Sequence, residues 1–175
     1  MALSEIEKDV DRLKVISERF SKVGSLPELN AQDLIRVAQQ TVSYLQKRTS
    51  SKVEFTTSWP TKPILLKLNE QLLSWTLENL IKNGIDAMKG KGKLQVSIGL
   101  KGDQAEILVS DTGAGISREN SSKIFNPGFS TKKRGWGLGL SLAKRIVVDY
   151  HKGKIGIKKT ALGKGTEIQI LLPKK

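Results

Sequence analysis

The chain of 175 residues contains no cysteine, a single histidine and only 5% aromatic residues. Without cysteine, disulfides, thiolate metal sites and cysteine nucleophiles are all excluded. No apolar run approaches the roughly 18 to 20 residues of a membrane-spanning helix. The residues that follow Met1 do not resemble a signal peptide. We therefore expect a soluble, cytoplasmic chain that makes no membrane contact, while the full-length protein could still be membrane-anchored.

Positive charge is what the sequence has in excess. It carries 30 Lys and Arg against 17 Asp and Glu, a net charge of +13. Residues 1–60 are almost neutral, with 9 basic and 8 acidic side chains, whereas residues 61–175 hold 21 basic and 9 acidic ones. Clustered Lys and Arg are typical of proteins that bind phosphate. The commoner explanation of such an excess is a solvated lysine-rich surface. The alternative is that the C-terminal two-thirds binds phosphate, in a polymer or in a small molecule.

The spacing of apolar residues predicts an α+β fold. Helical spacing covers residues 4–23, 30–48, 69–88 and 138–150, and strand-like alternation covers residues 53–57, 94–100, 105–110, 155–159 and 166–172. Helices on one face of a mostly antiparallel sheet form a two-layer α/β sandwich. We expect a helical segment over residues 1–50 and a second domain over residues 51–175. The stretch 111–137, rich in Gly, Ser and Lys, has the length of a binding loop or lid.

The first predicted helix, residues 4–23, has an apolar stripe that must pack against another element. It either lies on the main domain or forms half of a helical hairpin whose first half is missing. We favour the second interpretation.

The predicted helix over residues 69–88 carries two amides on one face, Asn79 and Asn83, four residues apart. Amide oxygens can act as neutral ligands of Mg²⁺, which prefers oxygen. Taken alone, the pair could equally be two amides on a helix surface.

A strand ending in Asp111 leads into Gly113 and Gly115. Glycines let the backbone approach a flat ligand closely, and the carboxylate can accept a hydrogen bond from an exocyclic amine. The simpler alternative is a turn in which the aspartate bonds its own backbone.

Three cations, at residues 132–134, precede a helix that begins among Gly135, Gly137 and Gly139. Alternating glycines expose successive N–H groups, and the start of a helix adds the positive end of its dipole. This segment therefore predicts an anion cradle.

In this order the motifs resemble the ATP-binding catalytic domain of sensor histidine kinases, within the GHKL superfamily. NLIKNGIDAM resembles the N box, DTGAGI the first glycine box, IFNPGFSTK the F box and GWGLGLSLAKRIV the second glycine box. The resemblance covers about residues 53–173. Residues 4–48 resemble, more weakly, the second helix of the dimerisation hairpin and the connector that follows it.

The resemblance implies a Bergerat-type ATP-binding fold with ATP and Mg²⁺ as cofactors. Asp111 would bind the adenine amine, and Asn83 would hold Mg²⁺ with Asn79 in the same site. Asn79, Asn83 and Lys132 would serve catalysis by positioning and neutralising the phosphates. The remaining nucleotide-binding residues implied are Asp86, Gly113, Gly115, Ile116, Phe125, Thr131, Gly135, Trp136, Gly137, Leu138, Gly139, Leu140 and Thr166. Phe125 and Phe129 would anchor a lid of about residues 117–134.

Two positions depart from the family pattern. Asp86 stands where kinases of this type often have a basic residue, and Trp136 replaces a small residue between the box glycines. The family's phosphoacceptor histidine is also missing. The single histidine, His151, ends a predicted helix, where a structural role is expected.

The implied function is that of a kinase module, which positions Mg-ATP for γ-phosphoryl transfer to a histidine on a dimerisation helix absent from this chain. The phosphoryl group would later pass to an aspartate of a response regulator. The implied partners are ATP, a response-regulator receiver domain and the acceptor helix of the same protein, which would be a homodimer at full length. We expect this chain to bind ATP without phosphorylating itself.

Two other functions remain as alternatives. An ATPase of another GHKL branch, such as a chaperone, topoisomerase or mismatch-repair protein, would carry a carboxylate base where this chain has Asn79. The neighbouring Glu78 points about 100° away around the helix. A basic nucleic-acid-binding module would show aromatic-rich strands, or a zinc or helix-turn-helix signature. Since the sequence shows none of these, no nucleic-acid partner is expected.

Overall fold

The computed structural model describes residues 26–132 and 135–174, so the predicted helix over residues 4–23 lies outside the described residues. The elements, in chain order, are β1 (Asn30–Asp33), α2 (Leu34–Gln46), β2 (Val53–Ser58), β3 (Leu65–Leu68), α3 (Glu70–Ala87), β4 (Gly92–Lys101), β5 (Gln104–Asp111), α4 (Arg118–Ser121), α5 (Gly139–Arg145), the π-helix η1 (Ile146–Tyr150), β6 (Lys154–Ala161) and β7 (Gly165–Pro173).

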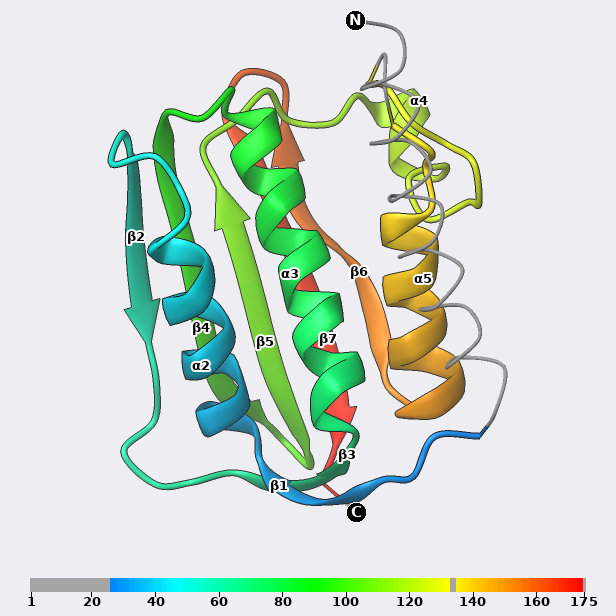
Figure 1. Ribbon diagram of the computed structural model, residues 1–175. Helices are drawn as coiled ribbons and strands as arrows, with labels where there is room; N and C mark the ends of the chain where they lie inside the picture. Colours follow the sequence, from blue (N-terminus) through cyan, green and yellow to red (C-terminus); the bar gives the residue numbers. More distant parts are fainter. Residues whose placement is uncertain (1–25, 133–134, 175) are drawn as a thin grey trace, which may run out of the picture.

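Five strands form the main sheet, in the order β2-β4-β5-β7-β6. The β2–β4 pair is parallel and the other three pairs are antiparallel. Helices α2, α3 and α5 lie on the same face of this sheet, with α3 between the other two (Figure 1). The predicted α+β class and two-layer arrangement are therefore confirmed.

The core lies between the sheet and the helices. Alternate residues of the central strands face the helices, and Val96, Ile107 and Ile170 are fully buried there. Helix α3 supplies Leu77 and Ile81 from the face that packs on the sheet. Helix α2 adds buried residues such as Leu34 to the same cluster. Residues before position 50, such as Leu34, and residues after it, such as Leu77, thus belong to one core.

The start of α2 differs from the prediction, which began this helix near Asn30. Asn30–Asp33 instead form β1, which pairs antiparallel with β3, a strand that the sequence pattern did not reveal. Asp33 is the N-cap of α2, since its Oδ1 accepts from Ile35 N (3.1 Å) and also from Ile64 N (3.1 Å). The helix therefore begins after Asp33, because this carboxylate accepts from the Ile35 N–H in the first turn.

The long loop and the helix after it also differ in detail. Residues 111–137 contain the short helix α4, capped by Ser117, whose Oγ accepts from Asn120 N (3.3 Å). The predicted helix over residues 138–150 is α5 followed by the π-helix η1, in which the amide of His151 donates to Ile146 O over five residues. In the described part of the chain, no helix combines the length and apolar character that crossing a bilayer requires.

Candidate functional site

Asp111 is the last residue of β5, a strand flanked on both sides, where it lies opposite Leu94 on β4 and Thr166 on β7. Helix α3 passes close to it at Gly84. A Cβ atom at position 84 would come within 2.9 Å of Leu94 Cδ1 and 3.2 Å of Asp111 Cβ. The helix can lie this close to the carboxylate because Gly84 has no side chain. The prediction from the sequence missed Gly84, although a glycine inside a long helical pattern signals such an approach.

The Asp111 carboxylate is half-buried at the end of the sheet. Burial raises the pKa of this carboxyl, while the backbone N–H groups of Gly113 and Thr166 oppose that rise. The Gly113 N–H donates to Asp111 Oδ1 at 2.8 Å, so the turn considered as an alternative is present. A carboxylate placed in this way can still accept a hydrogen bond from a ligand amine, since each oxygen has two lone pairs.

The loop after Asp111 is packed tightly between the end of α3 and the turn that joins β6 and β7. A Cβ atom at Gly113 would lie 2.5 Å from the carbonyl carbon of Ala87, and the Ala114 N–H donates to Ala87 O at 3.0 Å. Gly115 has a positive φ of 71°, and a Cβ atom there would lie 2.0 Å from Ala161 O. Both glycines are therefore required by close backbone contacts.

Two threonines of β6 and β7 also hold the loop that follows Asp111 in place. The Ile116 N–H donates to Thr160 Oγ1 at 2.9 Å, and Thr160 Oγ1 lies 2.9 Å from Thr166 Oγ1. Thr166 is 8% exposed. The sequence prediction included Ile116 and Thr166 but missed Thr160, which joins them.

Asn79 lies where α3 meets the first turn of α5. Its Nδ2 donates to Gly139 O at 3.4 Å, and a Cβ atom at Gly139 would be 3.4 Å from Asn79 Oδ1. Leu138, the N-cap residue of α5, has no side-chain atom that could accept a hydrogen bond from the first-turn N–H groups. An anion is a suitable acceptor for N–H groups in this position.

One turn further along α3, Asn83 and Asp86 meet Lys132 from the long loop. Lys132 Nζ donates to Asn83 Oδ1 at 3.1 Å and forms an ion pair with Asp86. The structure thus brings together three of the predicted site residues, although Lys132 is 49 residues from Asn83 in the chain. The contact of Lys132 with Asp86 was not predicted.

The second glycine segment packs against the loop that carries Phe129. Gly137 has a positive φ of 66°, and a Cβ atom there would be 2.4 Å from the carbonyl carbon of Gly128. The Gly128 N–H also donates to Gly137 O at 3.0 Å. Phe125, Phe129 and Leu140 pack against the core.

Two other predicted residues lie at the surface of this segment. Trp136 is 49% exposed, and Thr131 is also exposed. A Cβ atom at Gly135 would meet side-chain atoms, at 2.3 Å from Ser130 Oγ and 3.2 Å from Lys132 Cβ. This part of the loop is therefore less tightly packed than the turn after Asp111.

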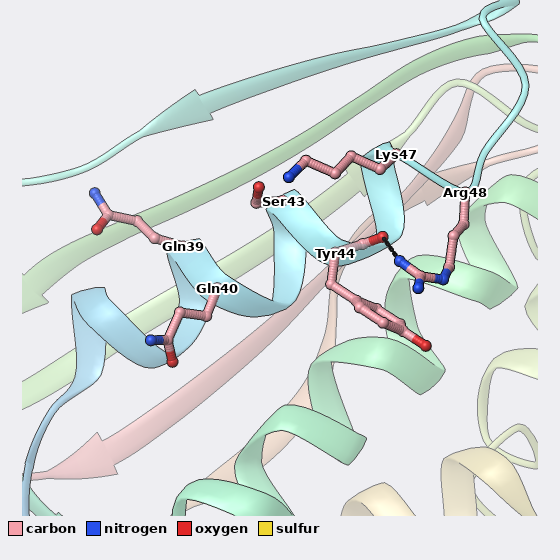
Figure 2. Close-up of a pocket in the computed structure, with 6 residues that line it drawn as sticks. All are labelled: Gln39, Gln40, Ser43, Tyr44, Lys47 and Arg48. Atoms are coloured by element: carbon pink, nitrogen blue, oxygen red, sulfur yellow. Dashed lines mark hydrogen bonds between the residues drawn. The ribbon is translucent and has the colours of Figure 1, made fainter.

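The pocket in Figure 2 lies elsewhere, on α2. It is lined by Gln39, Gln40, Ser43, Tyr44, Lys47 and Arg48. The Arg48 guanidinium stacks over the Tyr44 ring at 3.8 Å and donates to Tyr44 O at 3.3 Å. The pocket contains none of the predicted site residues.

Glu78 and His151 bear on the alternatives. Glu78 forms an ion pair with Lys82 one turn along α3. His151 is 4% exposed; its Nε2 accepts from the Asn69 N–H at 3.0 Å, so its Nδ1–H donates to Ile146 O at 2.9 Å. Burial lowers the pKa of this imidazole. Both ring nitrogens of His151 thus make structural bonds that join η1 to the start of α3.

Mg²⁺ is the metal that the motifs imply. Within the described residues, no group of three or more acidic or histidine side chains is placed to hold a metal ion. Asn83 and Asp86 nevertheless offer oxygens that converge on one cation, the Lys132 ammonium. Such a sparse oxygen set fits Mg²⁺, which keeps several waters and binds through one or two carboxylates together with phosphate oxygens.

Comparison with known proteins supports the interpretation of these motifs. Residues 68–175 match the model of the family described as "Histidine kinase-, DNA gyrase B-, and HSP90-like ATPase". Sporulation kinase D of Bacillus subtilis is 35% identical over 176 residues, an alignment that covers 97% of this chain and 34% of the kinase. The chain thus spans about a third of the length of this curated relative.

Solved structures show the same fold. The nucleotide-free catalytic domain of histidine kinase ThkA superposes with a TM-score of 0.76 and 25% identity, covering 85% of this chain and 97% of that one. Histidine kinase ThkA in complex with the response regulator protein TrrA gives a TM-score of 0.79 and 22% identity, covering 97% of this chain and 49% of that one. The predicted resemblance to histidine kinase catalytic domains is confirmed, and the chain belongs to the family of histidine kinase-, DNA gyrase B- and HSP90-like ATPases.

Proposed function

We propose that this chain is the ATP-binding kinase module of a two-component sensor histidine kinase. The observation that carries the proposal is the position of Asp111, a half-buried carboxylate at a strand end, beside a helix that has glycine at the point of approach. The Asp111 carboxylate would accept from the exocyclic amine of adenine, and Gly113 and Gly115 would form the wall of the adenine pocket. The same arrangement would disfavour a base that presents a carbonyl oxygen to the carboxylate.

The phosphates would lie along the polar side of α3, towards the start of α5. Asn79 faces that helix start, and Asn83 lies one turn further along α3, beside Lys132. When bound, Mg²⁺ would supply positive charge that neutralises the phosphate oxygens. Asn83 would hold it, and Lys132 would orient the terminal phosphate. Catalysis would rest on positioning and electrostatics, which align the γ-phosphoryl group with an imidazole nucleophile.

The acceptor histidine, the homodimer and the response regulator would belong to the full-length protein. Residues 4–23 have the apolar stripe of the second helix of a dimerisation hairpin, which supports a hairpin completed by residues outside this sequence. Among the solved structures of this fold, one is a histidine kinase in complex with its response regulator protein. An ATPase of another branch is less well supported, because Asn79 stands where such an enzyme would carry its base and Glu78 is paired with Lys82.

Isothermal titration calorimetry tests the adenine assignment. Asp111→Asn should weaken ATP binding by about tenfold or more, because an asparagine amide would direct a donor at the adenine amine. Asp103→Asn makes the same chemical change in the exposed turn between β4 and β5 and should leave the affinity unchanged. Equal affinities for Asp111→Asn and the wild type would show that adenine does not bind at Asp111.

A further inference from the structure

Asp86 and Lys132 form a contact that the proposed function does not explain. Lys132 Nζ lies 3.1 Å from Asn83 Oδ1 and pairs with the Asp86 carboxylate, so one ammonium holds both oxygens. Asn83 and Asp86 are three residues apart on α3, which places their side chains on adjoining positions of one helix face. Lys132 reaches them from a loop, 46 residues away from Asp86 in the chain. The two oxygens therefore converge on a single cation.

A divalent cation would compete for the same oxygens. Mg²⁺ and Mn²⁺ favour carboxylate and amide oxygens and complete their coordination with water or phosphate. An ammonium group and a divalent ion that share a carboxylate oxygen repel each other at short distance, so one excludes the other. Asp86 is the stronger ligand of the pair, because it carries the negative charge.

The Lys132 ammonium can leave its two oxygen partners at little cost. The side chains of Lys132 and Asp86 are 45% and 54% exposed, and exposed ion pairs contribute little net stability. The lysine stem is long and flexible, so its ammonium can swing from the helix toward an anion nearby. Displacement of Lys132 would therefore cost little free energy and would give the phosphates a cation.

We propose that Asn83, Asp86 and Lys132 form an exchangeable cation clasp, in which Asp86 is a ligand of the divalent cation and Lys132 is the group that this cation displaces. The clasp rests on the proposed function for its physiological ligand, Mg-ATP. It goes beyond that function in giving Asp86 a role in binding the metal and in giving Lys132 two alternative positions. Metal binding and the movement of Lys132 toward the phosphates are then one coupled event.

Direct binding of Mn²⁺ to the full chain, without nucleotide, tests the clasp. Electron paramagnetic resonance measures the free ion, whose signal falls as the ion binds. Lys132→Met should bind Mn²⁺ about tenfold more tightly than the wild type, because the competing ammonium is gone. Asp86→Asn should weaken binding by about tenfold, because the charged ligand is lost. The double variant Asp86→Asn with Lys132→Met should not recover the gain.

Lys82→Met is the matched control, since Lys82 also pairs with a carboxylate of α3 and its loss removes the same charge. It should change Mn²⁺ affinity far less than Lys132→Met does. Equal effects of the two lysine variants would reduce the result to general electrostatics and overturn the clasp. Unchanged Mn²⁺ affinity in Lys132→Met or in Asp86→Asn would also overturn it, provided that circular dichroism shows folded proteins. Failure of the proposed function would appear separately, as a wild-type chain that does not bind ATP in calorimetry.

Discussion

Around Asp111 the candidate site is built from strand ends and backbone contacts, whereas around Lys132 it is built from the side chains of a loop. A Cβ atom at Gly113 would meet the backbone of Ala87. The loop after Asp111 is also bonded to the end of α3 through main-chain atoms, since the Ala114 N–H donates to Ala87 O. Lys132 reaches α3 through its own flexible side chain. We infer that the end around Asp111, where we propose that adenine binds, is rigid and preformed. The end around Lys132, where we propose that the phosphates bind, is adaptable and takes its final shape around the ligand.

The largest expected difference between the two ends is in the loss of stability when one glycine of each is replaced by alanine. Gly113→Ala should lower the free energy of unfolding by about 1–3 kcal/mol, because its Cβ would overlap backbone atoms of Ala87 that cannot rotate away. Gly135→Ala should cost much less, since its Cβ would meet side-chain atoms of Ser130 and Lys132 and no backbone atoms. Urea denaturation of both variants measures the difference. Equal losses of stability would contradict the contrast between a rigid and an adaptable end.

The next effect concerns the charge at the rigid end. Burial raises the pKa of Asp111 in the folded chain, so the folded state binds a proton more readily than the unfolded one. The ionised carboxylate therefore lowers stability, and this cost appears as the pH rises from about 3.9, the unfolded value, through the folded pKa. Asp111→Asn should then be more stable than the wild type at neutral pH while binding ATP more weakly.

Urea midpoints at about pH 4 and about pH 7 measure this second effect. The advantage of Asp111→Asn over the wild type should be larger at the higher pH. Asp103→Asn, at an exposed turn, should show no such change with pH. A less stable Asp111→Asn at neutral pH would mean that the bonds from Gly113 and Thr166 outweigh the cost of burying the charge.

The smallest effect is expected at the adaptable end. Lys132→Met should change the free energy of unfolding by less than about 1 kcal/mol, because both partners of its ion pair are exposed. Lys158→Met removes a less exposed pair, with Glu106 on the sheet, and should cost more. A large loss of stability in Lys132→Met would show that the loop is part of the rigid structure.

The rigid end was the easier one to predict from the sequence. Strand alternation followed by Asp111, Gly113 and Gly115 is a local pattern, and the structure has a strand that ends at Asp111 and a tight turn after it. The approach of Gly84 was missed, because only the packed helix shows which atoms face it. The contact between Lys132 and Asp86 was also missed, since it joins side chains 46 residues apart that local spacing does not relate.

β1 shows the same limit in the fold. Helical spacing after Asn30 predicted an early start for α2, but Asn30–Asp33 pair with β3. Pairing with a distant segment decided the conformation there, because Asp33 bonds both α2 and Ile64. At positions where two distant segments meet, strand pairing between them outweighs the local helical propensity.

The bonds of His151 have a mechanical consequence for α5. His151 ties the far end of η1 to the first residue before α3, while the near end of α5 touches α3 through Asn79. The helical segment formed by α5 and η1 is therefore attached to α3 at both of its ends, through Asn79 and through His151. It cannot rotate away from α3 together with the loop that precedes it.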